Sequence, residues 1–204
     1  MCDDAEVAQG TAAALKAITI EGEAVLAVAA RVRDALPRAL DILSACQGRV
    51  LISGLGKSGH IGAKIAASLA SLGTPAFFIH PTEALHGDSG MVTPNDVAVL
   101  IAKSGTTAEV VAFGRIVASM GVPIIALTSG LDSPLADMAE VVLDIGVARE
   151  ADPHNLAPTA SAATTLAVGD ALAVGLSAVR QFTPAQFHAR HPGGALGQHL
   201  AGAE

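Results

Sequence analysis

Residues 50–73, VLISGLGKSGHIGAKIAASLASLG, combine a short apolar run, a glycine-rich turn and a helical pattern in one stretch. The run at residues 50–53 is typical of a strand that is buried on both faces of a sheet. Residues 59–72 have apolar positions at helical spacing, and Gly73 stands where the C-cap of a helix belongs. A strand that passes through glycines directly into a helix predicts the first half of a βαβ unit.

The same alternation continues toward the carboxyl end of the chain, with Gly121 at a second C-cap position and Pro134 in a first helical turn. Strands alternating with helices predict a mainly parallel sheet that is covered on both faces. We therefore expect a three-layer α/β/α fold, doubly wound, with five strands and with ligands bound beyond the strands' carboxyl ends. The other expected strands are residues 76–79, 97–101, 123–127 and 141–145, and the other helices are 106–120, 134–139 and 161–179.

The first 46 residues are rich in Ala, Leu, Val and Glu, and their apolar positions recur at helical spacing. Pro37 marks a kink or a break, so we expect one long N-terminal helix or two. We assign this helical segment, residues 1–46, to the same domain as the α/β part, residues 47–204. It packs either on its own domain or on a partner subunit, and the sequence leaves both alternatives open.

The composition disfavours several classes of partner. The chain has a net charge of −7 and no Trp or Tyr, so a nucleic-acid partner lacks both a basic surface and stacking platforms. Cys2 and Cys46 have neither metal-site nor disulfide spacing and are interpreted as ordinary thiols. The acidic start, MCDDAEVAQG, is unlike a secretory signal, and no apolar run is expected to reach membrane-spanning length. We expect a soluble, cytoplasmic protein without a membrane partner.

The first strand-to-helix junction raises a question of nucleotide binding. Gly54, Gly56 and Gly59 match the dinucleotide pattern G-x-G-x-x-G. That site also requires an acidic residue at the end of the next strand, where Glu83 is the only candidate and stands beyond a His-Pro pair. The tripeptide Gly-Lys-Ser resembles a Walker A loop, but Leu51 occupies the place of its first glycine. The Walker A interpretation is rejected, and a dinucleotide enzyme is kept as an alternative.

The second junction, AKSGTTAE at residues 102–109, offers backbone N–H groups, hydroxyl donors and the positive end of a helix dipole. Together these groups suit a terminal phosphate monoester. An alternative interpretation is helix capping, because Thr106 and Glu109 have the spacing of a capping box. Both junctions should lie side by side at the carboxyl edge of the sheet, which favours the phosphate site. We predict that the chain binds a phosphorylated small molecule, in particular a sugar phosphate.

From about residue 50 to residue 200 the sequence resembles the sugar isomerase (SIS) domain family and, more narrowly, the arabinose-5-phosphate isomerases. The resemblance implies an SIS fold and the interconversion of ribulose 5-phosphate and arabinose 5-phosphate, which supplies the precursor of the lipopolysaccharide sugar Kdo. It also implies a homotetramer whose sites are shared between subunits. Five blocks carry it: GLGKSGHIGAKIAASLASLGTPAFFIHPTEALHGD, MVTPNDV, SGTTAEV, READPHNLAPT with GDALAV, and HPGGALG.

The resemblance places a catalytic set at Lys57, Glu109, Glu150 and His191. Either glutamate could move the carbon proton, Lys57 would stabilise the enediolate, and His191 would reach in from a neighbouring subunit to exchange protons with the oxygens. No cofactor is implied, and no metal is expected because the histidines lack cysteine companions. Contacts to the substrate or its phosphate are expected at Gly56, Ser58, Ser104, Gly105, Thr106, Thr107, His86 and Thr159.

The sequence also departs from the family pattern. Thr106 replaces an acidic residue, Ala160 replaces a serine, and residues 152–155 read DPHN where Cys-Pro-Leu-Gly is usual. These departures leave the exact phosphosugar open. Longer family members continue into a pair of CBS domains, whereas this chain stops at Glu204, so we expect the short form. The alternative function is a non-catalytic SIS-domain sensor that binds a sugar phosphate or a nucleotide-activated sugar.

Overall fold

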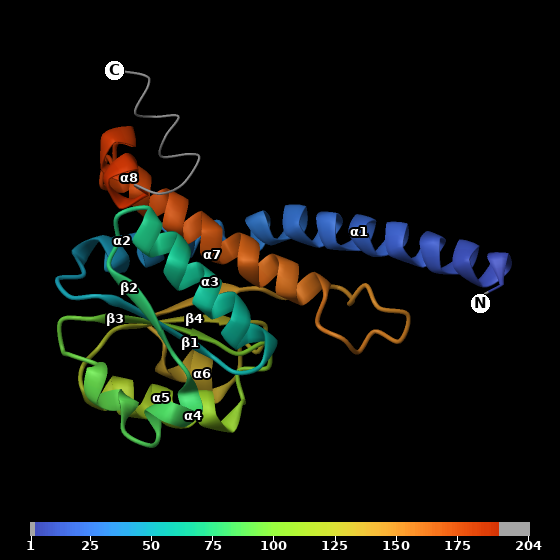
Figure 1. Ribbon diagram of the computed structural model, residues 1–204. Coiled ribbons are helices and arrows are strands. Elements are labelled where there is room, and N and C mark those ends of the chain that lie inside the picture. Colours follow the sequence, from blue (N-terminus) through green and yellow to red (C-terminus); the bar gives the residue numbers. More distant parts are fainter. Residues whose placement is uncertain (1–2, 192–204) are drawn as a thin grey trace.

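The computed structural model describes residues 3–191. Its sheet has five strands, all parallel, in the order β2-β1-β3-β4-β5 (Figure 1). The expected strands are confirmed, two of them with identical bounds and the other three to within one residue at each end. The strands are β1 Val50–Gly54, β2 Ala76–Ile79, β3 Val97–Ile101, β4 Ile124–Thr128 and β5 Val141–Asp144.

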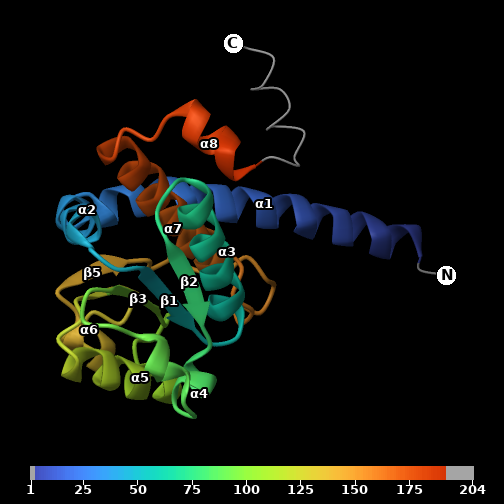
Figure 2. The same ribbon diagram turned by 60° about the vertical axis from the view of Figure 1, so that its left-hand side comes forward.

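Helices cover both faces of this sheet, which confirms the three-layer α/β/α prediction. Figures 1 and 2 show α1, α2, α3 and α7 over one face and α4, α5 and α6 over the other. The helices are α1 Asp4–Val32, α2 Leu36–Ala45, α3 Lys57–Ser71, α4 Pro81–Ala84, α5 Ala108–Ser119, α6 Pro134–Met138, α7 Ala160–Val179 and α8 Pro184–Arg190, with a 3₁₀ turn, η1, at Asp88–Met91.

Alternation along the strands assigns their side chains to two cores. In β1, Val50 and Ile52 belong to the core shared with α3 and α7, whereas Leu51 belongs to the core that contains Phe113 of α5. All five residues of β1 are buried, as are all five of β3 and of β4. Because both faces are covered, apolar residues suit most of these positions, with Ser53 and Thr128 as buried polar exceptions, and this is why short apolar runs indicate the strands.

The order of the strands creates the place where a ligand can bind. The chain runs from β1 outward to β2 and then returns to β3 on the other side of β1. Gly54, the last residue of β1, pairs with Ile101, the last residue of β3. The loops after these two strands therefore leave the sheet side by side at its carboxyl edge, at a topological switch point.

The N-terminal segment forms two helices, with the break between Val32 and Leu36. Pro37 lies in the first turn of α2, where its missing N–H costs nothing. Val28 and Val32 are buried in the core, but residues 3–16 are exposed. Figures 1 and 2 both show this amino-terminal half of α1 extending beyond the body of the subunit.

Helix α7 corrects one expectation. It has 20 residues and a mean hydropathy of 1.6, so by length and composition it is apolar enough to cross a membrane. The expectation that no apolar run approaches that length was therefore wrong. In the structure, however, Val168, Leu172 and Leu176 of α7 are buried in the core beside α3, as in the central helix of a globular domain.

Candidate functional site

The β1–α3 loop is short because glycines allow the backbone to turn sharply into the helix. Gly56 is the N-cap of α3, with a φ of +60° and no side-chain capping hydrogen bond. A Cβ at Gly59 would lie 2.6 Å from the carbonyl oxygen of Gly54, so only glycine lets the first turn of α3 approach the end of β1. Backbone packing thus accounts for the G-x-G-x-x-G spacing without a dinucleotide.

Lys57 occupies the first position of α3, directly after this turn. The positive end of the helix dipole disfavours a cation there, by about 0.3–1 kcal/mol at an exposed site. An unfavourable position is tolerated more readily where an anion binds, because the lysine and the helix terminus then attract the same charge. The placement of Lys57 therefore supports the predicted anion site.

The β3–α5 loop differs from its predicted capping pattern. Helix α5 begins at Ala108 with Thr107 as N-cap, and the Thr107 side chain makes no capping hydrogen bond. The N–H and the hydroxyl of Thr106 instead donate to Oγ of Ser104, at 3.2 and 2.9 Å. The capping box of Thr106 and Glu109 was therefore wrong. Within residues 3–191 no side chain caps the amino end of α5, so its free N–H groups have the arrangement that binds anions at helix termini.

Neighbouring elements fix the conformation of this loop. Gly105 has a φ of +70°, and a Cβ at this position would overlap the side chain of Ser133. The N–H of Leu135 donates to the carbonyl oxygen of Gly105 at 3.2 Å. The N–H of Gly105 donates to the carbonyl oxygen of Ala102 at 2.9 Å. The loop is therefore held in one conformation before any ligand arrives.

Glu150 is the most constrained acidic side chain near this edge. Only 2% of the residue is exposed, and its carboxylate accepts hydrogen bonds from the N–H groups of Thr159 and Ser161 at 2.8 and 3.1 Å. The hydroxyls of Thr159 and Ser161 also donate to it. Since Thr159 is the N-cap of α7, a distant carboxylate caps that helix in place of a local side chain.

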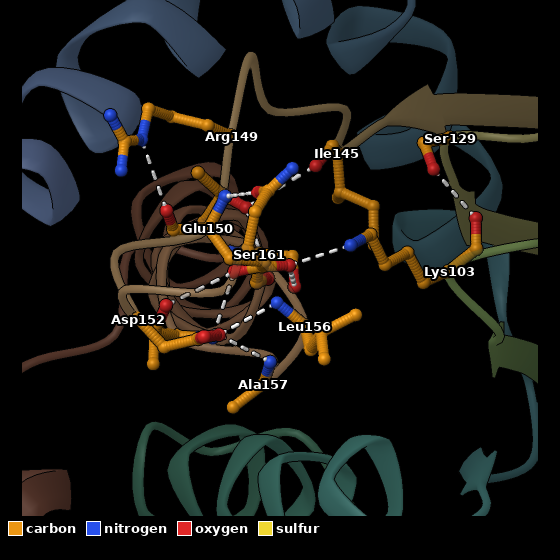
Figure 3. Close-up of polar contacts among 12 residues, drawn as sticks. Lys103, Ser129, Ile145, Arg149, Glu150, Asp152, Leu156, Ala157 and Ser161 are labelled. Carbon is orange, nitrogen blue, oxygen red and sulfur yellow. Dashed lines mark hydrogen bonds and ion pairs between the residues drawn. The ribbon is translucent and has the colours of Figure 1, made fainter.

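A fifth donor to Glu150 is the ammonium group of Lys103, with 2.6 Å between Nζ and Oε1 (Figure 3). Burial alone would raise the pKa of Glu150, but the hydrogen bonds from Lys103, Ser161 and Thr159 outweigh it and lower that pKa to about 2. Glu150 is therefore a carboxylate at any physiological pH.

A cavity of about 170 Å³ lies between the amino ends of α3 and α7. Lys57 and Ser58 line it from one side, Lys103 from the β3–α5 loop, and Ser161 and Thr165 from the other side. The two lysines carry more positive charge than Glu150 neutralises, so the cavity suits an anionic or strongly polar ligand.

A larger cavity, of about 440 Å³, lies at the opposite edge of the sheet and is lined by residues such as Arg38, Cys46 and Asp96. The Asp96 carboxylate already accepts the N–H groups of Arg49 and Thr93, each at 2.7 Å. The helices that follow the strands begin at the other edge, so their positive dipole ends do not face this cavity. We therefore place the candidate site at the smaller cavity.

The other predicted site residues are spread more widely. Gly56, Ser104, Gly105, Thr106 and Thr107 lie in the two loops described above. Glu109, in the first turn of α5, is half-buried and makes no side-chain hydrogen bond with residues 3–191. His86 is exposed and follows α4, and the hydroxyl of Thr159 belongs to the Glu150 network rather than to the cavity lining.

His191 lies far from the other predicted catalytic residues. It ends α8, where its ring stacks on Phe187 with 3.9 Å between the ring centroids. Figures 1 and 2 show α8 beyond the carboxyl end of α7, whereas Glu150 contacts the amino end. A helix of 20 residues is about 30 Å long, so His191 does not reach the cavity of its own subunit.

Lys103 and Ser161 were missed as site residues. Lys103 stands inside the AKSGTTAE stretch, and a cation beside a predicted phosphate loop was a usable signal. Its partner Glu150 is 47 residues away, and no local pattern joins the two. In the described residues 3–191, no group of three or more His, Cys, Asp or Glu side chains could hold a metal ion.

Comparison with known proteins gives one family. The SIS domain model matches residues 43–175. The chain is 50% identical over 187 residues to the arabinose 5-phosphate isomerase KdsD of Pseudomonas aeruginosa, covering 92% of this chain and 57% of that protein. It is also 50% identical over 163 residues to the arabinose 5-phosphate isomerase KpsF of Escherichia coli, covering 80% of this chain and 50% of that protein. The chain thus spans about half the length of the curated relatives it matches.

Solved structures agree with this result. An Escherichia coli CFT073 protein in complex with A5P is 39% identical to this chain. The alignment covers 94% of this chain and all of that one, with a TM-score of 0.87.

Proposed function

The chain belongs to the SIS domain family, and on this basis we propose that it is an aldose–ketose isomerase interconverting D-ribulose 5-phosphate and D-arabinose 5-phosphate. The observation that carries the proposal is the structural likeness, over 94% of this chain, to a protein whose structure was solved in complex with A5P. Two features of the geometry support it. The N-cap of α5, which follows the predicted phosphate loop, makes no side-chain hydrogen bond, and the neighbouring cavity is lined by Lys57 and Lys103.

The proposed reaction moves one proton between carbons and one between oxygens. A base removes the proton from C2 of the aldose, and the electron pair leaves negative charge on O1 of an enediolate. The base then delivers the proton to C1. O2 loses its hydroxyl proton and becomes the ketone oxygen, while O1 gains a proton, so no atom is gained or lost overall. Glu109 is the proposed carbon base because its carboxylate makes no side-chain hydrogen bond with residues 3–191. Lys57 stabilises the enediolate.

The proposal includes a homotetramer with sites shared between subunits. The position of His191 supports it, because the oxygen acid–base group would then come from a neighbouring chain. The exposed half of α1 supports it as well, since Val7, Leu15 and Ile18 are 56%, 63% and 69% exposed. Apolar side chains along an unpacked helix are typical of a surface that another subunit covers.

Residues 1–46 are proposed to be part of the same domain as residues 47–204. Ala39 and Leu43 of α2 support this, because both are fully buried in the core that contains β1 and α7. A cytoplasmic location is also part of the proposal, since the substrate would be a phosphorylated metabolite.

Incubation of the purified chain with ribulose 5-phosphate, followed by ³¹P NMR, tests the activity. We expect arabinose 5-phosphate to form without added metal or nucleotide. If the protein converted only another phosphosugar, the proposal that it is an isomerase would stand, but the proposed substrate would be wrong. Binding of phosphosugars with no turnover of any would favour the sensor function, which the isomerase relatives do not support.

A further inference from the structure

The side chain of Lys103 lies in the candidate site but has no role in the reaction described above. Its backbone is fixed, because its carbonyl oxygen accepts the N–H and hydroxyl of Ser129 at 2.9 and 2.7 Å and the hydroxyl of Thr128 at 3.2 Å. Its ammonium group extends from this anchor to Glu150 (Figure 3). Both ends of the residue are therefore held in place.

Glu150 has little capacity to act on a substrate. Two carboxylate oxygens offer about four lone-pair positions. Five donors from Lys103, Thr159 and Ser161 already approach them. A carboxylate with a pKa of about 2 is also a weak base for a carbon-bound proton. The structure thus gives Glu150 the task of holding other groups.

Lys103 has the opposite character. An ammonium group has three N–H donors, and among residues 3–191 only Glu150 accepts one. The Lys103 side chain is 46% exposed and lines the same cavity as Lys57. Donors therefore remain for a ligand oxygen, and the charge is already desolvated on one side.

The cavity lining also indicates which part of the ligand Lys103 would contact. It includes Lys57, Lys103 and Ser161 but none of residues 104–107, the part of the predicted loop 102–109 where the phosphate contacts are expected. A phosphosugar with its phosphate on that loop would direct its other oxygens toward the lysines.

We propose that Lys103 is a second cationic catalytic residue, which binds the substrate oxygen that becomes negative in the enediolate, and that Glu150 is its positioning residue. The inference rests on the proposed isomerase function. Lys103 keeps its protons throughout and stabilises O1 or O2 together with Lys57, while another group carries the proton between the carbons. Fixed charges aimed at a developing oxyanion act without reorganisation during the reaction.

The test compares Lys103→Met, Lys103→Arg and Glu150→Gln with the wild type, each checked for folding by circular dichroism. Lys64→Met is the matched control, because Lys64 forms an ion pair with Asp170 at 2.5 Å outside the cavity. We expect Lys103→Met to lower kcat about 100-fold and to change KM less than about threefold. Lys103→Arg should recover part of kcat, and Lys64→Met should match the wild type. The double variant Lys103→Met/Glu150→Gln should be no slower than Lys103→Met alone, because both changes remove one function.

A binding measurement tests the inference independently of turnover. Calorimetry with 4-phospho-D-erythronohydroxamate, whose hydroxamate has the charge of an enediolate, should show about 100-fold weaker binding to Lys103→Met than to wild type. Binding of arabinitol 5-phosphate, which carries no such charge, should be nearly unchanged. A wild-type protein that binds the hydroxamate but converts no pentose phosphate would contradict the proposed function alone. Equal hydroxamate affinity in both proteins, or a loss of arabinitol 5-phosphate affinity of the same size, would overturn the role of Lys103.

Discussion

Replacement of Glu150 by Gln should destabilise the folded chain strongly at neutral pH. The change keeps the shape of a residue that is only 2% exposed but removes its charge. It also turns an amide NH₂ group toward donors such as the N–H of Ser161, which now donates to the carboxylate at 3.1 Å. A buried donor without an acceptor costs about 1–3 kcal/mol.

The pKa of Glu150 gives a second measure of the same effect. Folding lowers it from 4.5 to about 2, and at about 1.4 kcal/mol per unit this corresponds to roughly 3 kcal/mol. Because the pKa of the folded state is depressed, the stabilisation is fully present above pH 4.5 and is lost as the pH falls toward 2. The stability gap between wild type and Glu150→Gln should therefore close over that interval.

Urea unfolding followed by far-UV circular dichroism measures this gap, and the absence of Trp and Tyr makes fluorescence unsuitable. Both proteins are compared at one concentration, because any assembly contributes to stability. At pH 7 we expect a loss of roughly 2–3 kcal/mol, equivalent to about 4–12 °C in Tm for a chain of this size. Glu109→Gln, at a half-buried carboxylate, should stay within about 0.5 kcal/mol. A loss below about 1 kcal/mol, or a gap that persists unchanged to pH 2.5, would refute the reasoning.

Three further predictions concern the loop, the shared site and the long helix. Gly105→Ala should weaken binding of arabinose 5-phosphate at least about 10-fold by calorimetry, because its Cβ overlaps Ser133; Gly121→Ala, with a similar φ of +72° but open space around it, is the control and should bind normally. His191→Ala and Lys57→Met should each be inactive as pure proteins, but mixed subunits should regain measurable turnover, and a mixture without activity would contradict a site shared between chains. Ile18→Glu should shift the light-scattering mass of the protein to a smaller assembly, and an unchanged mass would show that this part of α1 lies outside the interface.

Much of the fold could be predicted because the relevant signals are local. The runs that became β2 and β3 are both apolar and bounded by turn residues, so their bounds followed from the local sequence, although only β3 is buried along its whole length. The start of α5 was placed too early because Thr106 and Glu109 have the spacing of a capping box. In the structure, Thr106 bonds to Ser104 instead, and the helix begins at Ala108. The two short helices α4 and α8 were not predicted from the sequence.

The candidate site was predictable only in part. The neighbouring loops followed from the parallel topology alone, since β1 and β3 must bring their carboxyl ends together at a switch point. The ion pair of Lys103 and Glu150, in contrast, does not follow from the topology of the sheet. It depends on where a loop after β5 passes over the amino end of α7, and side-chain geometry at that distance along the chain leaves no periodic trace in the sequence.

The projecting half of α1 has a consequence for local stability. Helices without tertiary contacts are marginal in water, and this one contains Gly10 and Gly22, each of which disfavours a helix by about 1 kcal/mol relative to Ala. Amide hydrogens should thus exchange rapidly at the outer end of α1 in an isolated subunit and slowly near Val28 and Val32, where the helix meets the core. Association would extend that protection outward along the helix. Ordering of the chain and assembly of the subunits would then be a single coupled equilibrium, governed by protein concentration.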